Sequence, residues 1–193
     1  TIVADTMTVE TGSRVHADRE GYAGIADAVG GGPGAGEPGG GGGHGGRGGR
    51  AAGGAAYGLC LKPATLGSSG GGGGGSLPGA GGGAIRIIAN MLVADGTISA
   101  DGEGLYNNYA GSGAGGSIWI TAGTLTGSGA IRANGGGSKG GGPGSGAGGR
   151  VAIHTSVAME LPAGNVTAVA GWQYDWLKGE DGSVAMVDTS AGG

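Results

Sequence analysis

Residues 84–104 read AIRIIANMLVADGTISADGEG, and this pattern returns as SIWITAGTLTGSGAIRANGGG at 117–137 and as RVAIHTSVAMELPAGNVTAVAG at 150–171. Each copy opens on an apolar triplet such as Ile85-Arg86-Ile87, and a fourth triplet lies at 184–186, so the triplets begin 33 residues apart. A fixed internal period of this length indicates a repeat architecture, in which each unit packs on its neighbours.

Within each copy the apolar residues alternate with polar or small ones, and Ile, Val and Thr are frequent. This period of two is typical of half-buried β-strands. Turn dipeptides, Asp95-Gly96 and Ser128-Gly129, separate a longer strand from a shorter one. The N-terminal residues TIVADTMTVETGSRVHADREG have the same form. We therefore predict an all-β fold, a small parallel β-solenoid of about four coils.

Stacking the copies predicts which side chains lie above one another. The predicted columns are Ile85, Ile118, Val151 and Val184; then Ala17, Ala100, Ala133 and Ala168; then Asp18, Asp101 and Asn134. The small alanine column suits a narrow inward corner of the coil. The acidic column could bind calcium through its oxygens, but it does not match the nonapeptide calcium-binding repeat, so we expect it to stabilise turns.

Glycine makes up 57 of the 193 residues and is concentrated between the strand units, at 24–83, 105–116 and 138–149. A strict Gly-X-Y period is missing, which excludes collagen. A flexible loop remains an alternative. Because glycine lacks a Cβ, extended polyproline-II-like segments could instead pack closely and bond to one another. We predict such a packed layer on one side of the solenoid.

The chain is expected to form one domain over 1–193. Its parts are a first coil at 1–23, a glycine-rich insertion at 24–83, stacked repeats at 84–171, and an aromatic loop with an incomplete coil at 172–193. The incomplete coil exposes a strand edge, and exposed edges are templates for pairing with another chain.

Composition and motifs argue against several classes of function. A net charge of −4 disfavours nucleic-acid binding, and no run of about 20 apolar residues could span a membrane as a helix. His16, His44 and His154 have no metal-binding spacing, and glycine motifs occur without the strand–turn–helix context that a nucleotide site requires. We predict no enzyme activity, no cofactor and no metal.

The segment WQYDWLKGED at 172–181 interrupts the glycine pattern. In an extended segment Trp172, Tyr174 and Trp176 would share one face. They could cap the glycine layer, contact another subunit, or stack against carbohydrate.

The motifs Tyr57-Gly58, Gly-Gly-Gly-Ala84-Ile85-Arg86, Gly-Gly-Ser117-Ile118-Trp119 and Gly-Gly-Arg150-Val151-Ala152-Ile153, with Pro63-x-x-Leu66-Gly67-Ser68, resemble glycine-rich repeat regions of large bacterial secreted and surface proteins of adhesin or β-helical passenger type. The likeness runs from about residue 1 to 171 and fails at 172–181. It implies an extracellular, repetitive, non-catalytic segment, such as those found in biofilms, and transfers no catalytic residue.

Together these features predict an extracellular structural protein that forms a head-to-tail homopolymer or a rigid segment of an adhesin. The residues predicted to form the self-assembly interface are Ile2, Ala4, Met7, Val9, Val184 and Met186. The alternative function is a receptor-, glycan- or ice-binding module, such as a phage or bacterial tip adhesin, with surface glycans as partners of the aromatic face.

Overall fold

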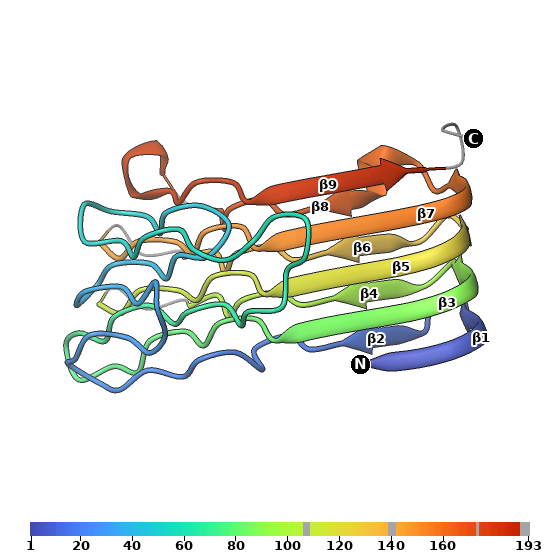
Figure 1. The fold of residues 1–193 in the computed structure, drawn as a ribbon. Coiled ribbons are helices and arrows are strands. Elements are labelled where there is room, and N and C mark those ends of the chain that lie inside the picture. The colour runs from blue at the N-terminus through green and yellow to red at the C-terminus, as the bar shows by residue number, and fades with distance from the viewer. Residues whose placement is uncertain (106–108, 139–141, 173, 190–193) are drawn as a thin grey trace.

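The computed structural model describes residues 1–105, 109–138, 142–172 and 174–189. It contains two all-parallel sheets, and the strands of each sheet come from successive coils (Figure 1). The long sheet has the order β1 (Ile2–Val9), β3 (Ala84–Ala94), β5 (Ser117–Thr126), β7 (Arg150–Glu160) and β9 (Ser183–Asp188). The short sheet has the order β2 (Arg14–His16), β4 (Thr97–Ser99), β6 (Ala130–Arg132) and β8 (Val166–Thr167). Two short 3₁₀ helices, η1 (Ala163–Asn165) and η2 (Asp175–Leu177), complete the described elements. The fold is a parallel β-solenoid, as the 33-residue period predicts.

The register confirms the predicted columns. Ile85 pairs with Ile118, Ile118 with Val151, and Val151 with Val184. In the short sheet Val15, Ile98, Ile131 and Val166 stack in the same way. Like residues therefore cover like, and each coil buries its apolar face against its neighbours rather than within itself.

The core lies between the two sheets. The largest fully buried apolar side chains of this core are Ile87, Leu92, Ile98, Ile118, Ile120, Leu125, Ile131 and Ile153, with Val151 beside them. Ala100, Ala133 and Ala168 are buried where the chain leaves the short sheet, which agrees with a narrow corner. A chain without Phe can fill this core with aliphatic side chains alone: the coil at 84–100 contributes Ile85, Ile87, Leu92 and Ile98.

The acidic column forms a ladder along this corner. A carboxylate oxygen of Asp18 accepts the backbone N–H of Asp101 at 2.8 Å, and Asp101 accepts the N–H of Asn134 at 2.8 Å. The Asn134 side chain accepts the N–H of Val169 at 3.0 Å. Each side chain thus replaces a backbone acceptor for the next coil, which is the turn-stabilising role predicted for the column.

Replacing Asp101 by alanine should lower the free energy of unfolding by about 1–2 kcal/mol, because the N–H of Asn134 loses its acceptor. Asp101→Asn is the matched control, since the amide oxygen of Asn134 already fills this position one coil higher. We expect the asparagine variant to unfold close to wild type in urea. Equal losses for both variants would show that the Arg132 ion pair, at 2.7 Å, matters more than the ladder.

The glycine-rich segments form a packed half of the molecule, to the left of the strands in Figure 1. Their hydrogen bonds follow a period of three. Along 111–116, Gly111 and Ala114 donate to segment 68–71, Ser112 and Gly115 to segment 144–147, and Gly113 and Gly116 to segment 100–103, at 2.8–3.1 Å. Three residues per turn is the repeat of polyproline II. Segment 144–149 repeats the arrangement with segments 39–42, 177–180 and 133–136 as its three neighbours.

This arrangement explains the glycine content. A backbone that bonds to three neighbours is surrounded by other backbones, so its Cα hydrogens face carbonyl oxygens. An added Cβ on Gly113 would overlap the carbonyl oxygen of Ala80, and one on Gly146 would overlap that of Gly113. Glycine carries a high entropy cost on folding, and dense backbone hydrogen bonding offsets that cost here. Where a side chain is tolerated inside the layer it is small, as with Ala114, Ala147, Ser112 and Ser145.

Candidate functional site: the two ends of the stack

The upper end of the long sheet is a step. The outermost strand, β9, covers only the first part of β7: its six residues pair with Arg150–Thr155. Within the described residues, the second part of β7, residues 156–160, has no strand above it. Val157 there is 65% exposed and Met159 is half-buried.

The lower end is a step of the opposite sense. β1 pairs with Ile87–Ala94, the second part of β3, and in the part of the chain that the structure describes no strand pairs with Ala84–Arg86 from below. β9 occupies the first part of the strand position at one end, and β1 occupies the second part at the other (Figure 1). β1 and β9 overlap in three of the columns of stacked residues. Residues 2–4 of β1 and residues 186–188 of β9 belong to the same columns; Ile2 and Met186, for example, both stack in the column of Ile87, Ile120 and Ile153.

The six residues predicted for self-assembly lie at these ends. Ile2, Ala4, Met7 and Val9 line the inward side of β1, and Val184 and Met186 line the inward side of β9, which puts all six at the ends of core columns. Ile2 and Val184 are exposed, Ala4, Met7 and Met186 are half-buried, and Val9 is buried. Their assembly role stays a prediction.

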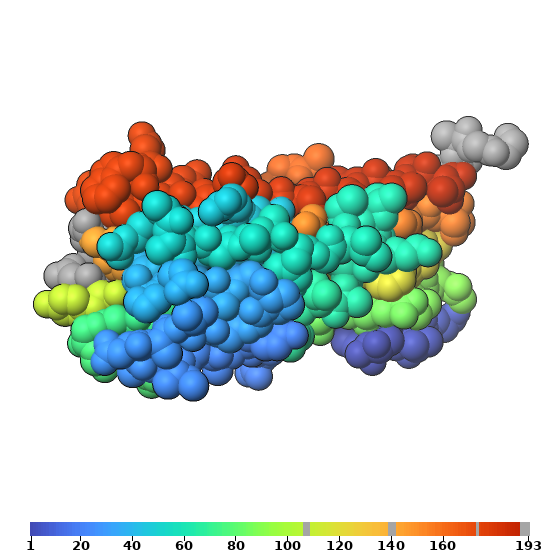
Figure 2. Space-filling model, turned by 60° about the vertical axis from the view of Figure 1, so that its left-hand side comes forward, coloured from blue at the N-terminus to red at the C-terminus, as the bar shows by residue number. Residues whose placement is uncertain are grey.

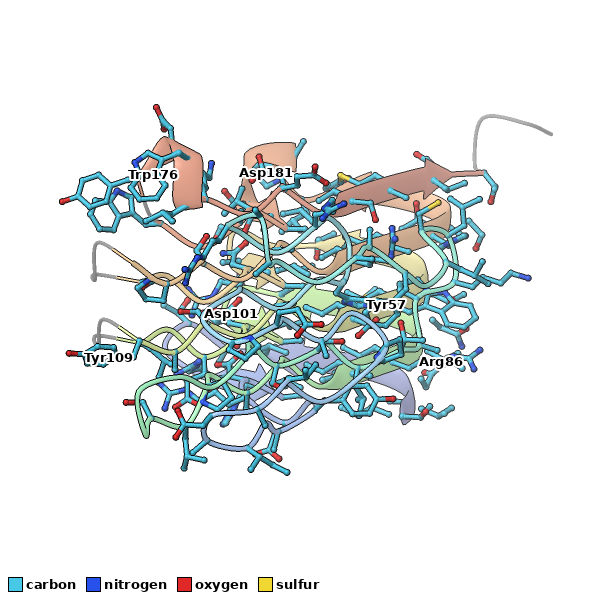
Figure 3. The ribbon with its side chains drawn as sticks, turned by 90° about the vertical axis from the view of Figure 1, so that its left-hand side faces the viewer. Tyr57, Arg86, Asp101, Tyr109, Trp176 and Asp181 are labelled. Atoms are coloured by element: carbon cyan, nitrogen blue, oxygen red, sulfur yellow. The ribbon has the colours of Figure 1, made fainter. Side chains whose placement is uncertain are left out.

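The aromatic loop projects from the upper end of the glycine-rich half (Figures 1 and 3). Trp172, Tyr174 and Trp176 are 65%, 56% and 73% exposed. The rings of Trp172 and Tyr174 lie 6.2 Å apart, tilted by 47°. The roles considered for these rings, as a capping, intersubunit or carbohydrate-binding face, stay predictions.

Leu177 anchors this loop. Its side chain is completely buried and its carbonyl oxygen accepts the N–H of Ser145 at 3.1 Å. The expectation of an extended segment with one aromatic face is wrong after Tyr174, because η2 turns the backbone there. Residue 173 of this loop and residues 190–193 of the predicted incomplete coil lie outside the described residues.

A buried polar cluster that the sequence did not indicate joins the insertion to the stack. His44 is completely buried, with Nδ1 2.8 Å from the carbonyl oxygen of Gly115 and Nε2 2.8 Å from the hydroxyl of Thr65. A carbonyl only accepts, so Nδ1 carries the hydrogen and Nε2 accepts from Thr65. The ring centre of Tyr57 lies 4.8 Å from that of His44.

Burial governs the electrostatics of this cluster. It lowers the pKa of His44 to about 4, with the Arg150 guanidinium acting in the same direction and the carbonyls of Gly115 and Gly116 opposing. Burial also raises the pKa of Tyr57 to about 12. Both side chains are therefore neutral at pH 7, and the cluster is suited to structure rather than to proton transfer.

Polar grooves run along the outer side of the short sheet. One is lined by Arg14, His16, Asp18, Asp101 and Arg132, with Arg19 and Gly102. Burial raises the pKa of Asp101, an effect that the N–H of Asn134 and the Arg132 side chain oppose. Arg14 pairs with Asp18 at 2.6 Å, so the carboxylates of this groove are already engaged by arginines. Among the described residues no cluster of three His, Cys, Asp or Glu side chains is arranged to hold a metal ion.

No helix in the described part of the chain is long and apolar enough to cross a membrane. Comparison of the sequence and fold with protein-family models, curated proteins and solved structures finds no match in any of the three.

Proposed function

We propose that this protein is a structural subunit of a fibre, in which copies of the chain stack head to tail along the axis of the solenoid. The observation that supports this most strongly is the pair of complementary steps. β9 fills the first part of a strand position at the upper end, and β1 fills the second part at the lower end. Laid in one layer, β9 and β1 make up one full strand of the length of β3. Heterologous contacts of this kind do not close on themselves and generate filaments.

In the proposed contact, β9 of one copy and β1 of the next share a single layer. Met7 of the upper copy then covers Met159 of the lower copy, since both belong to the column of Leu92 and Leu125. Val184 of the lower copy is covered by Ile85 of the upper copy. The overlap at Ile2 and Met186 requires a few residues of one strand to leave the sheet. The half-exposed ends of the core columns become buried, which favours association.

Two further observations agree with a structural rather than a catalytic role. The most strongly shifted titratable side chains, His44 and Tyr57, bond to neighbouring groups of the protein itself. The groove lined by Asp18 and Asp101 has both of these carboxylates paired with arginines, Arg14 and Arg132. An extracellular location is part of the proposal and rests on the resemblance to secreted repeat proteins.

A lysine in place of Val184 should abolish fibres while leaving the single chain folded. Val184 is 42% exposed in one copy, so the ammonium group of a lysine at this position is hydrated in the single chain. In the fibre the next copy would bury this ammonium group without a partner, at a cost of about 2–5 kcal/mol. Negative-stain electron microscopy and sedimentation velocity should show monomers. Thr8→Lys is the matched control, because Thr8 is exposed on the outer side of β1 and lies outside the three positions that β1 and β9 share.

Deletion of residues 1–10 removes the lower step and should give the same monomers. Fibres of unchanged length from either the deletion or the Val184→Lys variant would rule out this contact.

A further inference from the structure

A second pair of surfaces lies at the two ends of the glycine-rich half. At the upper end Trp172, Tyr174 and Trp176 are exposed on the aromatic loop. At the lower end the exposed large apolar side chains are Tyr22, Ile25, Val29 and Leu77, between 39% and 70% exposed. Clustered exposure of large apolar side chains on a protein surface marks an interaction surface.

Hydrogen bonds fix the position of the lower patch. The N–H of Tyr22 donates to Gly67 and its carbonyl oxygen accepts from Gly81, while Gly72 donates to Ala28. Segment 22–29 therefore lies along 67–72 and 79–83, which precede β3, the second layer of the long sheet. In Figures 1 and 2 this segment, in a lighter blue than β1, follows the lower edge of the glycine-rich half, and the orange-red aromatic loop stands at the upper edge.

We propose that the aromatic loop is a docking element for a second copy of this chain, and that it packs against the Tyr22, Ile25, Val29 and Leu77 patch of the next subunit. This inference rests on the proposed fibre and extends it. We expect the translation that brings β9 of one copy to β1 of the next to bring the lower patch toward the aromatic loop as well. Both contacts lie at the same pair of ends, so one stacking operation buries both.

The geometry of the rings favours a protein partner over a sugar. Trp172 and Tyr174 are tilted by 47° and do not form one flat platform, whereas a stacked sugar ring needs a flat aromatic face. Trp176 lies within η2, next to the buried Leu177, so the exposed ring is held on a fixed base. Large, fixed aromatic side chains are the residues that dominate protein–protein contacts.

End-blocked variants test the contact. Trp176→Asp blocks the upper end only, and Ile25→Asp blocks the lower end only. Both side chains are at least 70% exposed, so neither change should unfold the chain. Leu59→Asp is the control, because Leu59 is also 70% exposed but lies away from both ends. Its loop, residues 59–62, flanks the long sheet, since His154 of β7 bonds to the carbonyl oxygen of Leu61. We expect each end-blocked variant to raise the concentration needed for fibre formation by about thirtyfold or more, and Leu59→Asp to leave it unchanged.

Below that raised concentration, mixing the two end-blocked variants in equal amounts should give dimers and nothing larger, because one intact upper end meets one intact lower end and both outer ends are weakened. Sedimentation velocity measures this directly. Trp176→Asp fibres identical to wild type would overturn the inference while leaving the proposed fibre intact, and binding of a glycan panel by wild type but not by this variant would then assign the loop to sugars. Absence of fibres in wild type would overturn both proposals.

Discussion

Alanine at Gly113 or at Gly146 should each destabilise the protein by about 3 kcal/mol or more. The backbone of Gly113 donates to Glu103 and accepts from Gly136. A Cβ there would overlap the carbonyl oxygen of Ala80. Since backbone cannot rotate away as a side chain can, the neighbouring segments must separate and their hydrogen bonds must lengthen or break.

Gly164→Ala is the matched control, because a Cβ at that position meets nothing within 4 Å and its φ is not in the left-handed region. We expect it to be neutral or to stabilise by about 0.5 kcal/mol through the unfolded chain. Urea unfolding followed by circular dichroism gives the three free energies. Losses under about 1 kcal/mol at both Gly113 and Gly146 would mean that the glycine-rich half is a loose loop and not a packed layer.

Acidification should remove about 3 kcal/mol of stability between pH 7 and pH 4 through His44 alone. The pKa of His44 is about 4 in the folded protein and 6.5 for an unperturbed histidine. As the pH falls below 6.5 the unfolded chain binds a proton that the folded chain rejects, so the equilibrium shifts toward unfolding. The contribution is complete above pH 6.5, is reduced by about 2 kcal/mol at pH 5, and is lost near pH 4.

His44→Gln should flatten this part of the pH profile, and His16→Gln, which changes an exposed histidine, should leave it unchanged. A nuclear magnetic resonance titration of wild type provides a test that needs no variant. One imidazole should remain neutral until the pH approaches 4. Titration of all three imidazoles near pH 6.5 would contradict the burial of His44 between Gly115 and Thr65.

The strand half of the fold could be predicted from the sequence because its information is local and repeated. Ile85, Ile118, Val151 and Val184 identify one column by spacing alone, and the ladder from Asp18 to Asn134 follows from the same alignment. Register in a parallel stack is set by matching like with like, so the period determines the pairs.

The insertion at 24–83 could not be arranged in the same way. Its hydrogen bonds join segments of unequal spacing, such as Gly42 to Ser112 and Gly43 to Gly34, and glycine repeats carry no side-chain pattern that would identify partners. His44 is buried by this arrangement, so its environment could not be read from its neighbours in sequence. The burial of Leu177 could not be predicted either. Leu177 is a single apolar residue that follows three aromatic ones, and nothing in this order of residues indicates that Leu177 is buried while the aromatic rings are exposed.

The axial rise of the fibre, measured by helical cryo-electron microscopy, tests the head-to-tail contact most directly. If β9 and β1 of adjoining copies share one layer, each copy adds four layers, matching the four strands of the short sheet. With strands about 4.8 Å apart, the rise should be about 19 Å per copy. A rise of about 24 Å would mean that β1 sits above β9 as a separate layer, and single monodisperse particles at all concentrations would contradict the fibre itself.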